Sequence, residues 1–156
     1  MVLFEPEIPP NTGNVIRLCA NSGASLHLVK PLGFRLDDRS LRRSGLDYHD
    51  LASVAVYANL GACLAALPGA RIFAVETGGA RCYSQVSYRP GDVLLFGPET
   101  RGLPAAVRDQ VGRGNQIHIP MRPDSRSINL SNAVAIVLFE AWRQSGFAGG
   151  QSIADA

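Results

Sequence analysis

Three short apolar runs that each stop at a loop of glycine, proline and polar residues most constrain how this chain can fold. Short strands that end in irregular loops are typical of an α/β sheet, which forms its ligand crevice beyond the carboxyl ends of the strands. Glycine lets a ligand approach the backbone closely, and proline fixes φ and removes a donor. The loops therefore predict a compact cofactor held largely by backbone groups, rather than a metal. The runs are Arg71–Val75, Val93–Phe96 and Gln116–Ile119.

Strand and helix signals alternate along the rest of the chain. Pro6, Pro9 and Pro10 predict a rigid loop, after which Asn11 or Thr12 can cap a first helix. The alternation predicts an α/β fold with a mostly parallel sheet and helices on both faces. No linker divides residues 1–156, so we expect a single domain with a flexible glycine-rich tail over about 146–156. Further strands are predicted at Val2–Phe4, Ser25–Val29 and Val54–Tyr57, and further helices at Leu60–Leu67, Ala105–Val111 and Asn129–Gln144.

Length and composition indicate a globular domain. With 156 residues, 46% of them hydrophobic, the chain can bury one full core. No apolar run approaches the roughly 20 residues that span a bilayer, and nothing resembles a signal peptide. Cys19, Cys63 and Cys82 are widely spaced and form no C-x-x-C pair, which is typical of reduced thiols. We therefore expect a cytoplasmic protein without membrane contact.

Common nucleotide, hydrolase and metal motifs are missing from the sequence. It contains no G-x-G-x-x-G after a strand, no G-x-x-x-x-G-K-[ST] loop and no G-x-S-x-G elbow. His27, His49 and His118 are single and scattered, without the spacing of metal ligands. No metal site is expected.

The last predicted helix is apolar around most of its circumference. Val134, Ile136, Phe139 and Trp142 point in different directions on it. A helix of this kind is buried on nearly all sides, and a chain this short can cover one side by itself. We expect the other side to meet a second subunit in a homodimer; a central helix within one large core is the alternative.

Two polar clusters stand beside apolar helices. Asn11, Asn14 and Arg17 recur at intervals of three on the first helix, where the arginine is either a rim charge or a ligand-facing group. The second cluster has more polar residues than a helix cap requires, next to the free N–H groups of a helix start. It comprises Arg126, Ser127, Asn129, Ser131 and Asn132.

The order of these motifs resembles the SPOUT superfamily of S-adenosylmethionine-dependent RNA methyltransferases. The matching elements are N-T-G-N-V-I-R, L-F-G-P-E-T-R-G-L, and I-P-M followed by S-I-N-L-S-N-A-V-A. F-E-P-E-I-P-P-N-T-G-N, L-R-R-S-G-L-D-Y-H and P-D-S-R-S-I-N-L-S-N-A-V resemble its small single-domain TrmL branch of tRNA 2'-O-methyltransferases. The resemblance covers roughly residues 2 to 145 and leaves only the tail unmatched.

This resemblance implies a C-terminal trefoil knot, a rare exception to unknotted topology, and S-adenosyl-L-methionine as cofactor. It implies that the substrate is the ribose 2'-oxygen of the wobble nucleotide in the tRNA anticodon, a cytidine or modified uridine. Cofactor-binding positions would be Val75, Gly97, Ile119, Ser127 and Leu130, and catalytic positions would be Asn11, Arg17, Glu99, Ser127 and Asn129.

A role for Arg17 as base, as proposed for the family, is chemically awkward because a guanidinium is effectively always protonated. Our hypothesis is that Arg17 holds the adjacent phosphate and stabilises the developing alkoxide, while Ser127 or a water relays the proton. Glu99 and Asn11 would orient Arg17 and the ribose.

On this resemblance we expect the surface of the dimer itself, without a separate RNA-binding domain, to bind the tRNA anticodon loop. The net charge of +2 indicates little by itself, although fourteen of the fifteen basic residues are arginines. The candidates for RNA contacts are Arg42, Arg43, Tyr48 and His49, with arginine suited to phosphate and tyrosine to stacking on an unpaired base; a solvated loop is the alternative. Two rival functions remain: methylation of another tRNA or rRNA position, and a non-catalytic RNA-binding module.

Overall fold

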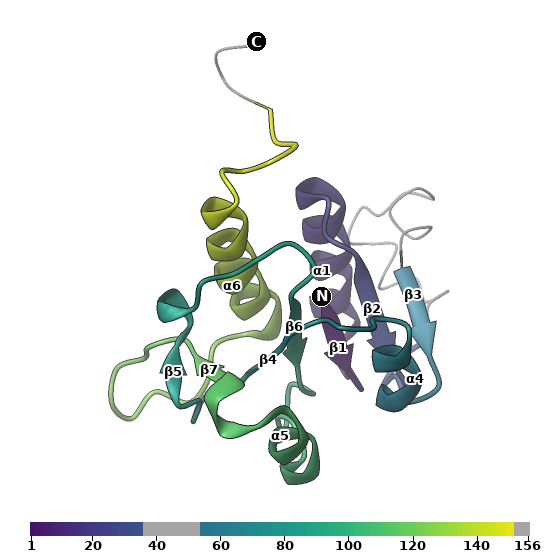
Figure 1. Ribbon diagram of the computed structural model, residues 1–156. Coiled ribbons are helices and arrows are strands. Elements are labelled where there is room, and N and C mark those ends of the chain that lie inside the picture. The colour runs from purple at the N-terminus through teal and green to yellow at the C-terminus, as the bar shows by residue number, and fades with distance from the viewer. Residues whose placement is uncertain (36–53, 152–156) are drawn as a thin grey trace.

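The computed structural model describes residues 1–35 and 54–151, and these contain one seven-stranded sheet. The strand order is β3-β2-β1-β6-β4-β7-β5, and every pair of neighbours is parallel (Figure 1). The parallel α/β architecture predicted from the alternating pattern is confirmed. The strands are β1 (Val2–Phe4), β2 (Leu26–Val29), β3 (Val54–Tyr57), β4 (Ile72–Val75), β5 (Arg81–Cys82), β6 (Val93–Phe96) and β7 (Gln116–His118).

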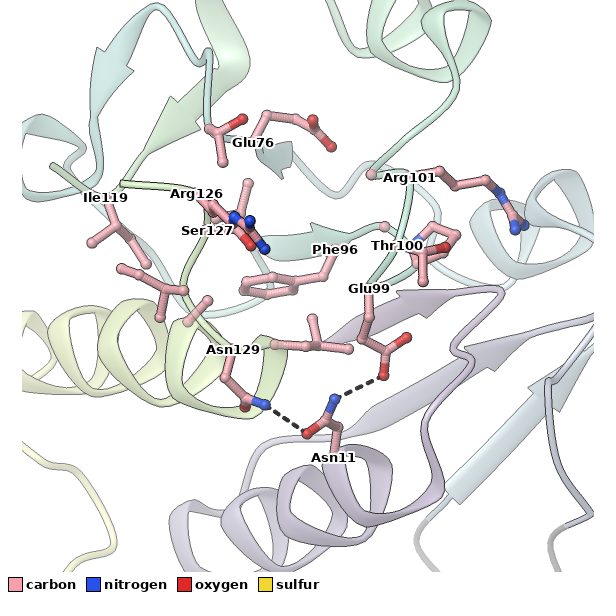
Figure 2. Close-up of a pocket in the computed structure, with 18 of the residues that line it drawn as sticks. Asn11, Glu76, Phe96, Glu99, Thr100, Arg101, Ile119, Arg126, Ser127 and Asn129 are labelled. Atoms are coloured by element: carbon pink, nitrogen blue, oxygen red, sulfur yellow. Dashed lines mark hydrogen bonds between the residues drawn. The ribbon is translucent and has the colours of Figure 1, made fainter. Parts of the chain in front are cut away.

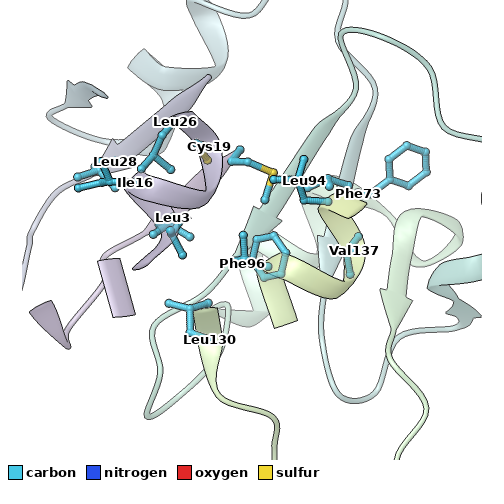
Figure 3. Packing of buried hydrophobic residues seen from close by; sticks show 14 of the residues in the cluster. Leu3, Ile16, Cys19, Leu26, Leu28, Phe73, Leu94, Phe96, Leu130 and Val137 are labelled. Carbon is cyan, nitrogen blue, oxygen red and sulfur yellow. The ribbon is translucent and has the colours of Figure 1, made fainter. Parts of the chain in front are cut away.

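Helices cover both faces of the sheet, as the sequence predicted. Successive side chains of a strand point to opposite faces, and in β6 Leu94 and Phe96 join one buried cluster while Val93 and Leu95 join the other. The first cluster packs against α1 and α6, which lie side by side, and the second against α4 and α5 (Figures 1 and 3). The helices are α1 (Pro9–Ser22), α4 (Leu60–Ala65), α5 (Ala105–Val111) and α6 (Leu130–Gln144), with 3-10 turns η1 (Tyr83–Gln85) and η2 (Arg113–Asn115).

The first helix begins earlier than predicted. Pro9 and Pro10 occupy its first turn instead of the preceding loop, and Ile8 is the N-cap without a side-chain hydrogen bond. Proline suits this place because its φ is already helical and the first turn has no use for its missing N–H. The side chain of Asn11 is consequently not a cap and is available for contacts elsewhere. The helix ends at Gly23, whose φ of 72° is the left-handed conformation that closes many helices.

The loop after β4 leads into a further strand that the sequence did not predict. Two-residue β5 and the turn η1 follow it, and such short elements carry no periodic signal. β7 then pairs with β4 on one side and β5 on the other. The last strand of the sheet therefore lies between two strands that precede it in the chain.

α6 is buried along only one side in the single chain. Leu130, Val134, Val137 and Leu138 are buried, whereas Phe139 is 43% exposed. The expectation of burial on nearly all sides is thus not met by one subunit alone. Among the described residues, no helix combines the length and apolarity that crossing a membrane requires.

Candidate functional site

A cavity of about 440 Å³ lies beyond the carboxyl ends of β1, β4, β6 and β7 (Figure 2). This volume falls within the range of small-molecule sites, and the carboxyl edge is where parallel sheets bind ligands. All three loops identified from the sequence contribute to the wall, as does the start of α6. The residues that line the cavity include Asn11, Val75, Glu76, Phe96, Gly97, Glu99, Arg101, Gly102, Arg108, Ile119, Arg126, Ser127, Asn129 and Leu130.

Two glycines allow these loops to pack backbone against backbone. A Cβ atom at Gly97 would overlap the backbone of Gly102 and Leu103, so the loop after β6 folds tightly on itself. A Cβ atom at Gly79 would overlap the carbonyl group of Ile117, so the loop after β4 lies directly against β7. The absence of side chains at these two points lets the loops pack closely at the carboxyl edge of the sheet.

A line of side-chain hydrogen bonds joins three of the predicted catalytic residues (Figure 2). Asn11 donates from Nδ2 to Glu99 Oε1 at 3.1 Å, and Asn129 donates from Nδ2 to Asn11 Oδ1 at 2.9 Å. Asn129 Oδ1 in turn accepts from the N–H of Ser131 at 3.0 Å and caps α6. The Glu99 carboxylate can only accept, so the Nδ2 of Asn11 faces it and the Oδ1 of Asn11 faces the Nδ2 of Asn129. These hydrogen bonds hold the starts of α1 and α6 together.

Glu7 and Glu99 together hold the loop after β6 to the start of α1, because the carboxylate of each accepts from donors in the segment of the other. Glu99 accepts from the N–H groups of Glu7 at 2.8 Å and Ile8 at 3.2 Å. Glu7 accepts from the hydroxyl of Thr100 at 2.7 Å and from Arg101 Nη1 at 2.7 Å. The hydrogen bond from the Thr100 hydroxyl lowers the pKa of the partly exposed Glu7 carboxyl, with a smaller contribution from the Arg101 charge.

Glu76 lies on the other side of the cavity. Its Oε1 accepts from the N–H of Leu103 at 2.9 Å, and its Oε2 lies 3.9 Å from Arg108 Nη1. Burial raises the pKa of this carboxyl, against smaller opposite effects of Leu103 and Arg108. Arg101 and Arg126 also line the cavity, so three arginines stand beside the carboxylates of Glu76 and Glu99 in its wall.

The structure brings together most of the residues predicted from the resemblance. All five cofactor-binding positions line the cavity, and so do Asn11, Glu99, Ser127 and Asn129 among the catalytic positions. Arg17 is exposed on α1 and is not among the lining residues of the same chain. The candidates for RNA contacts, Arg42, Arg43, Tyr48 and His49, lie outside the described residues.

The sequence reasoning missed the roles of Glu7 and Glu76. Glu7 precedes the first helix and Glu76 directly follows the β4 run, so the position of Glu76 at a strand end was an available signal. The pairing of Glu7 with Thr100 spans more than ninety residues and had none. Residues 1–35 and 54–151 contain no group of three or more His, Cys, Asp or Glu able to hold a metal ion.

The cavity suits an adenosyl cofactor. Val75, Phe96, Ile119 and Leu130 offer apolar surface to a flat base. Main-chain groups of the glycine loops and the arginines offer hydrogen bonds and a match for a carboxylate. Asn11 and Asn129 line the same cavity and place polar side chains beside this apolar surface.

Comparisons with known proteins agree with this arrangement. A tRNA (cytidine(34)-2'-O)-methyltransferase of Methylovorus glucosotrophus is 57% identical over 96% of this chain and 97% of its own length. A structure solved for insights into the 2-OH methylation of C/U34 on tRNA superposes with a TM-score of 0.86 at 45% identity, covering 93% of this chain and 94% of that one. The SpoU methyltransferase AviRb from Streptomyces viridochromogenes in complex with AdoMet gives a TM-score of 0.79 at 27% identity, covering 92% of this chain and 59% of that one. Residues 1–139, which make up most of the chain, match the SpoU rRNA Methylase family, and the chain therefore belongs to this family.

Proposed function

We propose that this protein transfers a methyl group from S-adenosyl-L-methionine to the ribose 2'-oxygen of nucleotide 34 in the tRNA anticodon, a cytidine or a modified uridine. The observation that carries the proposal is the convergence of residues from four separate segments on one cavity. The segments are the start of α1, the loops after β4 and β6, and the chain from Ile119 to α6. Relatives of nearly the same length that bear this activity in their names support the substrate.

Val75, Gly97, Ile119, Ser127 and Leu130 hold the cofactor in this proposal. When bound, S-adenosyl-L-methionine supplies a methyl group on a sulfonium centre for in-line displacement by the ribose oxygen. The protein then has to position the oxygen and exclude water, which is where much of the rate enhancement arises. The line of hydrogen bonds from Glu99 through Asn11 to Asn129 is suited to positioning because it is complete before substrate arrives.

Arg17 holds the phosphate beside the target ribose and stabilises the alkoxide that develops on it, and Ser127 or a water relays the proton. Ser127 is exposed at the cavity, where it can reach solvent. Glu99 keeps Asn11 in the orientation that faces the ribose. A guanidinium that stays charged throughout can act by electrostatic stabilisation without exchanging a proton.

The C-terminal part of the chain is threaded in a trefoil knot in this proposal. The strand order supports it, because β7 lies between β4 and β5 although both come earlier in the chain. The main-chain contact of Gly79 with Ile117 and the hydrogen bond from Leu103 to Glu76 bring the same crossing segments into contact. A knotted crossing would hold the loops rigidly around a bent cofactor.

The protein acts as a homodimer through the outer surfaces of α1 and α6. The exposed Phe139 ring on α6 and the contact between the two helices support this surface. Arg17 is exposed on α1 and would then lie close to the subunit boundary. Light scattering at micromolar concentration tests this, and a monomeric mass would contradict it.

Arg42, Arg43, Tyr48 and His49 bind the anticodon loop, and the protein works in the cytoplasm, where tRNA is the available substrate. Removal of phosphate contacts lowers the salt dependence of binding. We expect Arg42→Ala/Arg43→Ala to show a shallower slope of log Kd against log salt than the wild type. Identical slopes would remove these residues from the interface.

The decisive experiment incubates the protein and S-adenosyl-L-methionine with total tRNA from a strain that lacks this modification. Mass mapping of ribose methylation should find new 2'-O-methyl groups at nucleotide 34. Methylation at another tRNA position, or only of ribosomal RNA, would replace the substrate while keeping the chemistry. No methylation of either RNA would favour a binding module.

A further inference from the structure

Glu76 is a largely buried carboxylate with one oxygen left for a ligand. Its N–H donates to the carbonyl of Ile117 at 2.9 Å, so the residue is anchored where β4 and β7 end. Oε1 accepts from the N–H of Leu103 at 2.9 Å. Oε2 lies 3.9 Å from Arg108 Nη1, which is beyond hydrogen-bonding distance, and within the described residues it has no hydrogen bond. The side chain is 12% exposed and lines the cavity.

An oxygen in this situation favours a donor brought by a ligand. An ionised carboxylate has about four acceptor sites, and withdrawing it from water costs free energy unless hydrogen bonds replace the water. The raised pKa of the Glu76 carboxyl, caused chiefly by burial, agrees with incomplete replacement by Leu103 and Arg108. The neighbouring backbone leaves Oε2 accessible: a Cβ atom at Gly102 would lie 3.2 Å from it, and glycine has none.

We infer that Glu76 binds the adenosyl ribose of the cofactor, accepting a hydrogen bond from one ribose hydroxyl through Oε2. The inference rests on the proposed methyltransferase function. It adds a cofactor-binding residue to the five positions derived from the resemblance and gives the cavity a means of recognising the sugar.

The charges around Glu76 favour a hydroxyl over the ammonium group of the methionine moiety. Arg108 already stands close to the carboxylate, and Arg126 lines the same cavity. A second full positive charge near Glu76 would be repelled by these guanidinium groups, whereas a neutral hydroxyl is not. The arginines themselves suit the methionine carboxylate.

Calorimetric titration with nucleosides that lack one group at a time tests the inference. The ligands are S-adenosylhomocysteine, 5'-methylthioadenosine, and the 2'-deoxy and 3'-deoxy forms of the latter. The proteins are the wild type, Glu76→Gln, Glu76→Ala and the control Asp109→Asn, which removes an equal charge from the exposed surface of α5. Thermal unfolding without ligand checks that each variant is folded.

Loss of one of the two hydroxyls should weaken binding to the wild type by about 10- to 100-fold, the range for a hydrogen bond to a charged group. Glu76→Ala should bind 5'-methylthioadenosine correspondingly less tightly and should no longer distinguish it from either deoxy form. Glu76→Gln keeps an acceptor for Leu103 and should weaken binding by about tenfold. Asp109→Asn should behave as the wild type.

If the wild type binds S-adenosylhomocysteine, two results would overturn the inference about Glu76 and leave the proposed function standing. In one, hydroxyl removal costs Glu76→Ala as much as it costs the wild type. In the other, the variants are weakened toward S-adenosylhomocysteine but not toward 5'-methylthioadenosine, which would assign Glu76 to the ammonium. Failure of the wild type to bind any of these nucleosides would overturn the proposed function and the inference together.

Discussion

Glu99 and Glu76 are carboxylates on the same cavity, yet the protein uses them differently. Glu99 accepts from two backbone N–H groups and from the amide of Asn11, so protein donors occupy both of its oxygens. Glu76 accepts only from Leu103 among the described residues, and its second oxygen is left over. The comparison teaches that a residue in a cavity wall can serve either to build the wall or to bind what enters, and that its unused hydrogen-bonding capacity tells the two apart.

The region around Glu99 connects parts of the chain that are far apart in sequence. Through Glu7, Asn11 and Asn129 it joins the starts of α1 and α6 to the loop after β6. This preorganises the side on which the acceptor ribose is proposed to bind. The region around Glu76 is held mainly by backbone contacts between loops and keeps free polar capacity for the cofactor.

Arg17 lies outside both regions. Its removal should have the largest effect on turnover and little effect on the hydrogen bonds of Glu99 and Glu76. We expect Arg17→Ala to lower kcat by about 100-fold, as loss of one stabilising donor does in other enzymes. Affinity for S-adenosylhomocysteine should stay as in the wild type. Single-turnover methylation and calorimetry measure the two quantities. A loss confined to cofactor binding would place Arg17 in the wrong role, and near-normal turnover of Arg17→Lys would argue against the guanidinium geometry.

Gly97→Ala should damage both regions at once, because the added Cβ atom overlaps the backbone of Gly102 and Leu103. We expect a loss of about 1–3 kcal/mol in the free energy of unfolding, as for other overpacked sites, together with weaker cofactor binding. Urea denaturation and calorimetry report these. Gly78→Ala is the matched control, since a Cβ atom there meets nothing within 4 Å. Equal stability of the two variants would show that the loop can shift without cost.

Glu99→Ala should disrupt the region around Glu99 and leave the region around Glu76 intact. It leaves the N–H groups of Glu7 and Ile8 and the Asn11 amide without their acceptor, which should cost about 1–3 kcal/mol in unfolding free energy. Turnover should fall with it because Asn11 loses its orientation, while the hydroxyl dependence of nucleoside binding should persist. If that dependence disappeared, the two regions would not be separable.

Asn129→Ala should have a smaller effect on the same side. It removes the cap of α6 and the hydrogen bond to Asn11, and loss of a helix cap costs about 1 kcal/mol. Asn129→Asp keeps the side-chain oxygen that caps α6 but replaces the Nδ2 donor toward Asn11 with an acceptor oxygen. A stability of Asn129→Asp close to that of the wild type, with lower turnover, would assign the two functions to the two ends of one side chain.

The pH dependence of stability should show the smallest effect and should have opposite signs for Glu7 and Glu76. Burial raises the pKa of Glu76, so the folded protein binds more protons than the unfolded chain, and stability falls as pH rises from the ordinary carboxyl value toward the raised one. The pKa of Glu7 is lowered by the hydrogen bond from the Thr100 hydroxyl, so its contribution is present above the ordinary value and is lost as pH falls through the lowered one.

Unfolding free energies of the wild type, Glu76→Gln and Glu7→Gln between pH 3 and 8 test these signs. Glu76→Gln should flatten the fall in unfolding free energy that occurs as pH rises above the ordinary carboxyl pKa, which is about 4.3. Glu7→Gln should flatten the rise below it. A Glu76→Gln profile parallel to that of the wild type would contradict a raised pKa.

Much of the fold could be predicted from local patterns. β1, β3, β6 and α5 have the predicted bounds, because apolar runs and Gly or Pro boundaries are signals carried by neighbouring residues. The start of α1 and the strand β5 were not predicted correctly. In the first case proline was compatible with two structures, and in the second two residues were too few to form a pattern.

The candidate site, like the fold, could be predicted from the sequence only in part. Gly97, Ser127 and Asn129 were found because they stand in motifs beside predicted strands and helices, and the structure brings them to one cavity. Whether the free side of Glu76 faces that cavity depends on the pairing of β4 with β7, which no local pattern specifies. The sequence on its own determined the α/β alternation, the loops at the strand ends and the family resemblance, because each resides in residues close along the chain. Tertiary structure alone decided the strand order, the Glu7–Glu99 contact and the unused oxygen of Glu76, because these depend on which distant segments meet and on how much water their meeting excludes.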